Sequence, residues 1–115
     1  VLGANGENKV LTAGCYTGQE HQVVDINNGL IRMTSTHPLM TTKGWSALDV
    51  VEAKKLQADD MEIIPLVEGL ELVMGDGDPV VIDTLHTSTG VATVYTIKVN
   101  NDHTYIANGI VTHNK

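Results

Sequence analysis

The chain has 115 residues, a formal net charge of −7 and a single cysteine, which fits one domain and excludes a disulfide framework within the chain. Apolar residues make up 42% and charged residues 18%, so the composition is that of a folded domain and excludes a disordered chain. The acidic charge and an aromatic share of 3% argue against nucleic-acid binding, and the apolar runs are too short to span a membrane.

The first third of the chain predicts short strands and one hairpin. Residues 10–11 and 15–17 are candidate short strands, and residues 23–26 and 30–34 flank an Asn-Asn-Gly sequence at 27–29. Asn-Gly tolerates positive φ at both central positions of a type I′ turn, which is a strong hairpin signal. We therefore expect an antiparallel pair of strands here.

The next segment departs from the β pattern and predicts a short helix over residues 47–57. Ser46 is placed to cap its amino terminus, with Asp49 three residues later in a capping-box arrangement. The apolar positions at helical spacing are Leu48, Val51 and Leu56.

The second half of the chain predicts further hairpins. Its candidate strands span residues 70–74, 80–82, 91–99, 104–107 and 110–112. A Gly-Asp-Gly-Asp turn joins the first two, and a second Asn-Gly pair, Asn108-Gly109, joins the last two. The predicted fold class is all-β: one domain over residues 1–115, built mostly of antiparallel hairpins with a single short helix.

The histidines do not predict a metal site. They are His21, His37, His86, His103 and His113. None of the spacings typical of zinc ligands, such as HExxH, HxH or a cysteine–histidine pair, is present, so we expect no metal. Asp76 and Asp78 flank a glycine as in some calcium loops, but the closing glutamate of such a loop is missing, which favours a polar turn.

Cys15 has two interpretations. A histidine close to it in the fold would make it a nucleophile, whereas a lone cysteine in a β-rich segment is more often a small buried apolar side chain. The sequence does not show such a contact, so the buried interpretation is favoured.

Three segments carry more specific patterns. Residues 94–99 read Val-Tyr-Thr-Ile-Lys-Val, and residues 102–114 read Asp-His-Thr-Tyr-Ile-Ala-Asn-Gly-Ile-Val-Thr-His-Asn. Residues 34–39 read Thr-Ser-Thr-His-Pro-Leu, and a Gly-Trp step follows at Gly44 and Trp45. In this order, with a His-Asn pair one residue from the last position, they resemble the Hint superfamily of inteins, bacterial or phage-type intein-like domains and hedgehog-type autoprocessing domains.

The resemblance implies a horseshoe of antiparallel hairpins that processes its own chain. The side-chain amide of Asn114 can attack its own backbone carbonyl and close a succinimide, which breaks the Asn114–Lys115 peptide bond. By resemblance, His113 would protonate the leaving amine or polarise the carbonyl, and His103 would help to deprotonate the Asn114 amide. The implied activity is a single-turnover self-cleavage, for which we expect no cofactor.

The block at residues 34–37 has an upstream role by the same resemblance. At that junction, a Cys or Ser at the first position of the domain shifts the acyl group to its own side chain. His37 would contact the amide nitrogen, and Thr34 would support a strained or oxyanion-stabilised geometry. The other interpretation of His37 is a histidine satisfied by hydrogen bonds beside the bend at Pro38.

The sequence departs from the family pattern at three places. No opening block with a nucleophile matches, and Cys15 lies too close to His37 to provide it. Lys115, the first residue downstream of the domain, stands where a splicing intein has Cys, Ser or Thr, which disfavours true splicing. Thr96 stands where many relatives have Asp or Cys, which leaves open how protons are handled there.

Two interpretations account for the missing opening block. The chain is the carboxyl-terminal piece of an atypically split intein with a short amino-terminal partner, or a truncated, ligated or engineered form of a contiguous domain. In either case its substrate is the flanking polypeptide. The lack of a signal-peptide pattern favours a soluble, cytoplasmic domain over a secreted one. The rival hypothesis is an inactive β module that structures or binds within a larger phage or surface protein.

Overall fold

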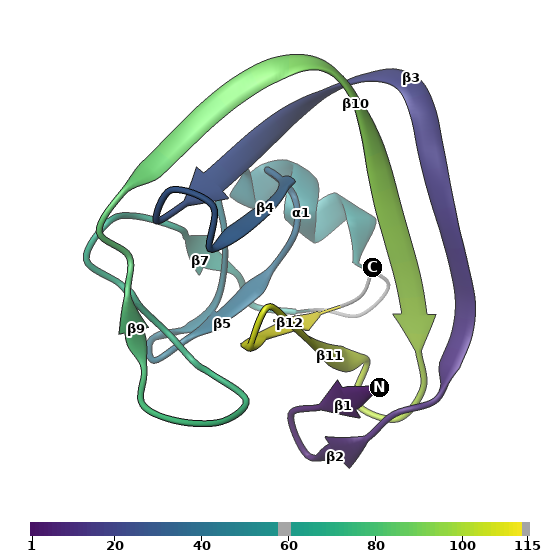
Figure 1. Cartoon of the computed structure of the whole chain (residues 1–115), viewed down its shortest axis with the longest axis vertical. Helices are drawn as coiled ribbons and strands as arrows, with labels where there is room; N and C mark the ends of the chain where they lie inside the picture. The colour runs from purple at the N-terminus through teal and green to yellow at the C-terminus, as the bar shows by residue number, and fades with distance from the viewer. Residues whose placement is uncertain (58–60, 114–115) are drawn as a thin grey trace.

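The computed structural model describes residues 1–57 and 61–113, without the side chain of Tyr16, and its largest feature is a long two-stranded arm. β3 (Val10–Ile26) pairs antiparallel with β10 (Leu85–Val99) along nearly the whole of both strands. Figure 1 shows this pair as a curved ribbon that arches around the rest of the domain. The arm gives the domain the horseshoe outline that the sequence predicts.

The arm is longer than the sequence predicts. Residues 10–11, 15–17 and 23–26 belong to one continuous strand, and β10 begins at Leu85, well before the predicted start at Val91. Most side chains along the outer part of the arm are exposed, so no apolar alternation marks these strands in the sequence. Backbone pairing between β3 and β10 defines them instead.

A second sheet carries the predicted motif residues. Its strands are β5 (Leu39–Thr41), β6 (Gly44–Ala47), β7 (Ile64–Pro65), β8 (Glu71–Leu72), β9 (Val80–Val81), β11 (Thr104–Ala107) and β12 (Ile110–His113). They are hydrogen-bonded in the order β11-β12-β5-β6-β7, while β8 pairs with both β5 and β9. The β6–β7 pair is parallel and the others are antiparallel. Through β5, the segment that follows His37 lies beside the strand that ends at His113.

Two shorter pieces complete the strands. β4 (Ile31–Thr34) pairs with the end of β3. β1 (Leu2–Gly3) and β2 (Gly6–Glu7) form an amino-terminal hairpin that lies against β11. The strands predicted over 70–74 and 80–82 form, but only as the shorter β8 and β9. The predicted all-β fold class is confirmed.

Both predicted Asn-Gly turns form, and they differ in length. Asn108 and Gly109 have φ values of 48° and 81°, the positive values of a type I′ turn, and they join β11 to β12. Residues 27–30 separate β3 from β4, and the first three of them have positive φ. Asn27 accepts a hydrogen bond on its side-chain oxygen from the amide of Asp83 at 2.7 Å, a tertiary contact that favours the longer loop.

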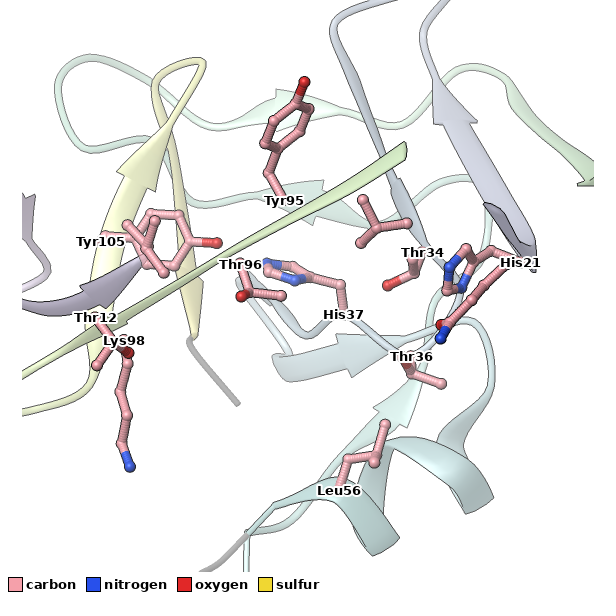
Figure 2. Close-up of a pocket in the computed structure, with 13 residues that line it drawn as sticks. Thr12, His21, Thr34, Thr36, His37, Leu56, Tyr95, Thr96, Lys98 and Tyr105 are labelled. Atoms are coloured by element: carbon pink, nitrogen blue, oxygen red, sulfur yellow. The ribbon is translucent and has the colours of Figure 1, made fainter. Parts of the chain in front are cut away.

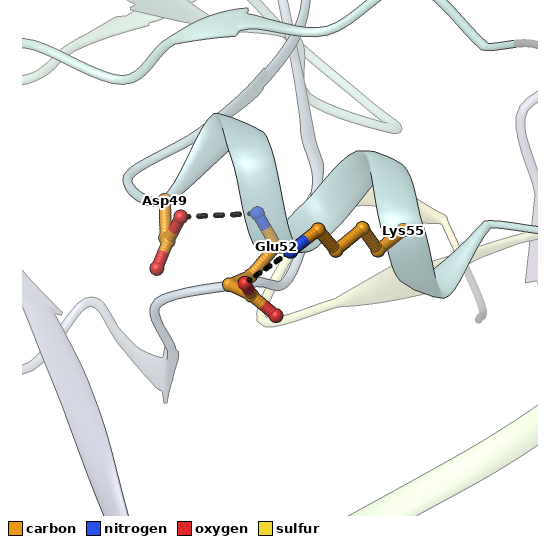
Figure 3. Close-up of polar contacts among 3 residues, drawn as sticks. All are labelled: Asp49, Glu52 and Lys55. Atoms are coloured by element: carbon orange, nitrogen blue, oxygen red, sulfur yellow. Dashed lines mark hydrogen bonds and ion pairs between the residues drawn. The ribbon is translucent and has the colours of Figure 1, made fainter.

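The predicted helix forms but begins later than predicted. α1 spans Val50–Leu56, and Asp49 is its amino-terminal cap, with Oδ1 accepting a hydrogen bond from the Glu52 amide at 3.1 Å (Figure 3). The prediction that Ser46 is the cap was wrong. Ser46 is fully buried in β6, and its hydroxyl lies 3.1 Å from the hydroxyl of Thr41, so the sheet uses the group that the cap would need.

Of the predicted apolar stripe, Leu48 packs against buried core residues, but the other two positions are exposed. Val51 is 65% exposed and Leu56 is 49% exposed, whereas Ala53 is fully buried. Ala53 packs with Ala47 and Ile63 in a small apolar cluster. A small side chain therefore allows the helix to approach the sheet closely.

The main core lies where the base of the arm meets the second sheet. It includes Val24, Ile26, Ile31, Leu39, Leu66, Leu72, Ile82 and Ile110, all almost fully buried. The outer arm is exposed instead, with Val91 and Tyr95 exposed by 73% and 77%. Within the described residues, no helix is long and apolar enough to cross a membrane.

Candidate active site

Thr34, the last residue of β4, and His37, three residues later, are the residues of the first motif. The amide of His37 donates a 3.1 Å hydrogen bond to the carbonyl oxygen of Thr34, which closes the turn between β4 and β5. The His37 ring meets the ring of Tyr105 edge to face, with the two ring centroids 6.2 Å apart (Figure 2). We call Thr34, His37 and Tyr105 the His37 cluster.

The His37 cluster lines a cavity of about 580 Å³ that also extends along the arm. His21 and Thr96, on β3 and β10, contribute to its walls (Figure 2). Burial raises the pKa of the Tyr105 phenol above its ordinary value, which makes ionisation of this group still less favourable. A cavity of this size can hold a short peptide segment beside His37.

His113, the histidine of the His-Asn pair, ends β12 and is only 7% exposed. Trp45 from β6 packs against its ring edge to face, with the ring centroids 5.2 Å apart. The His103 ring lies on another side, with its centroid 6.2 Å from that of His113. The amide of His113 donates a 3.3 Å hydrogen bond to the carbonyl oxygen of Pro38, the residue after His37. We call His103, His113 and Trp45 the His113 cluster.

His103 has a defined ring orientation. Its Nδ1 lies 3.1 Å from the carbonyl oxygen of Val99, and because a carbonyl can only accept a hydrogen bond, Nδ1 carries the proton. The neutral ring then has its lone pair on Nε2, where it can accept a proton from another group. This is the protonation pattern that a general base requires.

The two clusters lie on opposite faces of the β11–β12 hairpin. Thr104 pairs with His113 and Tyr105 pairs with Thr112, and successive side chains of a strand point to opposite faces. The side chains of Tyr105 and His113 therefore leave the hairpin in opposite directions. The two clusters are therefore separate sites, one on each face of the hairpin.

Asp102 directly precedes His103 and accepts several hydrogen bonds. They come from Nδ2 of Asn5 and of Asn8, and from the amide and hydroxyl of Thr104, at distances between 2.7 and 3.2 Å. Desolvation by itself raises the pKa of this carboxyl, but these bonds outweigh it and lower the pKa of Asp102 to about 2. Asp102 is therefore charged at neutral pH and holds the turn that carries His103.

The cysteine and the two aspartates that the sequence analysis considered are exposed. Cys15 is exposed on β3, opposite Tyr95, so the expectation of a buried apolar side chain was wrong. Asp76 and Asp78 are exposed in the turn that precedes β9. Among the residues that the structure describes, no group of three or more His, Cys, Asp or Glu side chains is close enough to hold a metal ion.

Asn114 and Lys115, between which the predicted cleavage falls, lie outside the described residues. The structure does place the strand that leads to them, because β12 ends at His113. It brings Thr34 together with His37, and His103 together with His113, as the two motifs require.

Sequence reasoning missed the partners of these histidines. The sequence places Tyr105 in a predicted strand and Trp45 in the Gly-Trp pair after the first motif. It does not predict that either ring contacts a histidine. Trp45 is the chain's single tryptophan, and an aromatic residue next to a short motif was the one available signal for its role. Asp102 gave no signal, because its partners Asn5 and Asn8 are at the other end of the chain.

Comparison with solved structures shows what the fold resembles. The gp41-1 intein matches with a TM-score of 0.68 at 21% sequence identity, over 98% of this chain and 77% of the intein. The bacterial intein-like domain from Clostridium thermocellum matches with a TM-score of 0.62 at 24% identity, over 93% of this chain and 70% of that domain. A DnaB intein from Synechocystis matches with a TM-score of 0.58 at 22% identity, over 94% and 68%. No family model matches the sequence, and no curated protein is significantly similar to it.

The likeness lies in the three-dimensional arrangement, since the identities are low and the matches cover almost the whole of this chain. The match to the gp41-1 intein extends over 98% of this chain, so it is not limited to one sheet or one hairpin. The chain therefore has the Hint fold of inteins and bacterial intein-like domains.

Proposed function

We propose that the chain cleaves its own backbone after Asn114 by cyclisation of the asparagine side chain. The observation that carries the proposal is the His113 cluster, in which the rings of His103 and His113 lie 6.2 Å apart at the end of the strand that leads to Asn114. The Hint fold supports the proposal, because the solved structures that share it are inteins and an intein-like domain.

The reaction forms one bond and breaks one bond. The side-chain nitrogen of Asn114 attacks the backbone carbonyl carbon of the same residue and loses a proton. The bond between that carbon and the nitrogen of Lys115 breaks, and the nitrogen gains a proton. The products are a carboxyl-terminal succinimide and a free amine, and no water is consumed. Because the attack occurs within one residue, the fold has to hold the geometry and move protons.

His103 and His113 share the proton transfers in this proposal. Nε2 of His103, which the hydrogen bond from Nδ1 to Val99 leaves unprotonated in the neutral ring, accepts the proton of the Asn114 amide directly or through one water. His113, packed against Trp45, protonates the leaving amine or polarises the scissile carbonyl. Both are transfers that histidine performs near neutral pH.

The proposal assigns a second junction to the His37 cluster. A segment with a Cys or Ser nucleophile, carried by the same or by a separate polypeptide, enters the cavity beside His37. There His37 protonates the junction's amide nitrogen, and Thr34 stabilises the strained carbonyl while the acyl group moves to the nucleophile. The substrate is the flanking polypeptide, and each chain reacts once.

The test follows the loss of a peptide fused after Lys115, by intact-mass spectrometry at neutral pH. Asn114→Ala abolishes cleavage, because alanine has no nucleophilic amide. His113→Ala slows cleavage by about a hundredfold or more, the usual effect of losing a general acid. His86→Gln changes an exposed histidine on β10 and leaves the rate unchanged.

Adding a peptide that carries the family's opening block tests the second junction. Cleavage that increases with peptide concentration supports the role of the His37 cluster. A fully intact fusion with and without the peptide contradicts the proposal and favours an inactive β module. Equal cleavage in Asn114→Ala also contradicts it, because another group must then break the bond.

A further inference from the structure

The amino-terminal hairpin of β1 and β2 holds the turn that carries His103. The amide of Ala4 donates a 2.8 Å hydrogen bond to the hydroxyl of Thr104. The amide of Lys9 donates another, also 2.8 Å long, to the side-chain oxygen of Asn100. Figure 1 shows the hairpin beside β11. Two segments from opposite ends of the described chain are thus joined around one histidine.

Asn8 is the centre of this contact. It is only 4% exposed, and its side-chain amide bonds to residues on both sides of His103. Nδ2 donates to the carboxylate of Asp102 at 2.8 Å and to the carbonyl oxygen of Thr104 at 2.6 Å, while Oδ1 accepts from Nδ2 of Asn101 at 3.1 Å. One buried amide therefore fixes the residues directly before and after His103.

Gly3 makes the close approach of Asn8 possible. A Cβ atom at Gly3 would collide with Nδ2 of Asn8 and would lie 2.9 Å from both the carbonyl and the hydroxyl oxygen of Thr104. Gly3 is buried against these groups. A larger residue would push the hairpin away from the turn.

His103 needs this support because its backbone conformation is unfavourable. His103 has a φ value of 60°, in the left-handed region that costs most L residues about 1 kcal/mol or more. Without the bonds from Asn8 the turn can relax to a more favourable conformation. Relaxation would move the His103 ring and weaken its hydrogen bond to the carbonyl oxygen of Val99.

We propose that Asn8, with the space that Gly3 provides, is a positioning residue for His103. It fixes the turn so that Nδ1 of His103 donates to Val99 and Nε2 is left as the base. The functional meaning of this inference rests on the proposed cleavage after Asn114. The tautomer itself is a property of the folded chain and can be measured without any cleavage.

The first measurement is the tautomer of His103, by NMR of the ring nitrogens in chain labelled with ¹⁵N at histidine. The native chain shows the Nδ1–H form. Asn8→Ala and the isosteric Asn8→Asp both shift His103 toward the Nε2–H form that free histidine favours in water, while signals from the arm stay native. Glu7→Gln, at the exposed neighbour of Asn8, is the control and keeps the native tautomer.

The second measurement is the cleavage rate of the fusion used above. Both Asn8 variants react about tenfold to a hundredfold more slowly, because a displacement of about 1 Å at a catalytic group can cost about a hundredfold. Glu7→Gln reacts at the native rate.

A native tautomer together with a native rate in both Asn8 variants would overturn the inference. Loss of the whole fold in both variants would also overturn it, because Asn8 would then support the domain rather than His103. A shifted tautomer in the variants, with no cleavage even by the native chain, would support the positioning role and contradict the proposed function alone.

Discussion

At the residue scale, the neighbours of each polar group set where its proton lies. Burial raises the pKa of the Tyr105 phenol, and hydrogen bonds lower the pKa of the Asp102 carboxyl to about 2. The carbonyl of Val99 fixes the proton of His103 on Nδ1. The His37 cluster therefore contains a phenol donor, and the His113 cluster contains an imidazole whose neutral form has its lone pair on Nε2.

Asp102 makes the stability of the domain depend on pH in the acid range. Its pKa is lowered from 3.8 to about 2 in the folded chain, so folding favours the charged form. This stabilisation is fully present above the unfolded value of 3.8 and is lost as the pH falls through about 2. Because solvent screens a partly exposed carboxylate, we expect a loss of about 1 kcal/mol in the free energy of unfolding.

Urea unfolding at several pH values in this range measures the effect. Asp102→Asn keeps the shape of the side chain and flattens the acid part of the profile. Asp76→Asn changes a carboxylate in an exposed turn and keeps the native profile. A native acid profile in Asp102→Asn would show that other groups produce the dependence.

At the scale of the secondary-structure element, the side chain of Asp49 determines where α1 begins. Asp49 accepts a hydrogen bond from the Glu52 amide, and Glu52 pairs with Lys55 one turn later, Nζ to Oε1 at 3.1 Å (Figure 3). The two interactions differ in strength. The cap satisfies a backbone donor that has no partner within the helix, whereas the ion pair joins side chains that are 66% and 52% exposed.

Replacing the cap of α1 is therefore more costly than replacing its ion pair. Asp49→Ala lowers the free energy of unfolding by about 1 kcal/mol, the usual cost of a lost amino-terminal cap. Lys55→Ala, on the exposed face, lowers it by about 0.5 kcal/mol or less. Denaturant unfolding of both variants checks the order, and a larger loss in Lys55→Ala would contradict the assignment of Asp49 as the cap.

At the scale of the whole molecule, the buried core supports one end of the arm, and most of the rest of the arm is exposed. The core joins β3 of the arm, and β4 beside it, to β5, β8 and β12 of the second sheet. The outer arm is held by its two-stranded pairing and leaves Val91 exposed. One part of the long strands β3 and β10 therefore contributes to the stabilising core, and another part forms a wall of the cavity.

Substitutions in these two parts have different effects on stability. Leu72→Ala removes a fully buried side chain of the core and lowers the free energy of unfolding by about 2–5 kcal/mol. Val91→Ala, on the outer arm, changes it by about 0.5 kcal/mol or less, as exposed positions usually do. Equal losses in the two variants, measured by denaturant unfolding, would show that the outer arm is part of the stabilising core.

Features that depend on neighbouring residues were predictable from the sequence. The turn at Asn108-Gly109 forms as predicted because the backbone preferences of two adjacent residues are enough to specify it. The two strands that it joins form as β11 and β12, close to the predicted bounds. The closeness of the His103 and His113 rings follows in turn, because this hairpin folds one histidine back toward the other.

Features that depend on how the strands are arranged in the fold, or on residues distant in the sequence, were not predictable. The start of α1 was misplaced because Ser46 gives its hydroxyl to a contact with Thr41 in the sheet. The support of His103 was missed because Asn8 is 94 positions from its partner Asp102. An asparagine near the start of a chain carries no local signal of such a contact. Only the folded structure shows that it lies against the turn.

The mass of the cleaved chain tests the central claim most directly. Cyclisation of Asn114 consumes no water, so the first product observed after incubation ends in a succinimide at residue 114 and is one water lighter than the hydrolysis product of the Asn114–Lys115 bond. The succinimide form appears first and converts slowly to the heavier form as the ring opens in water. A product that has the full hydrolysis mass from the earliest time point, or a chain that keeps Lys115 throughout, would contradict the claim.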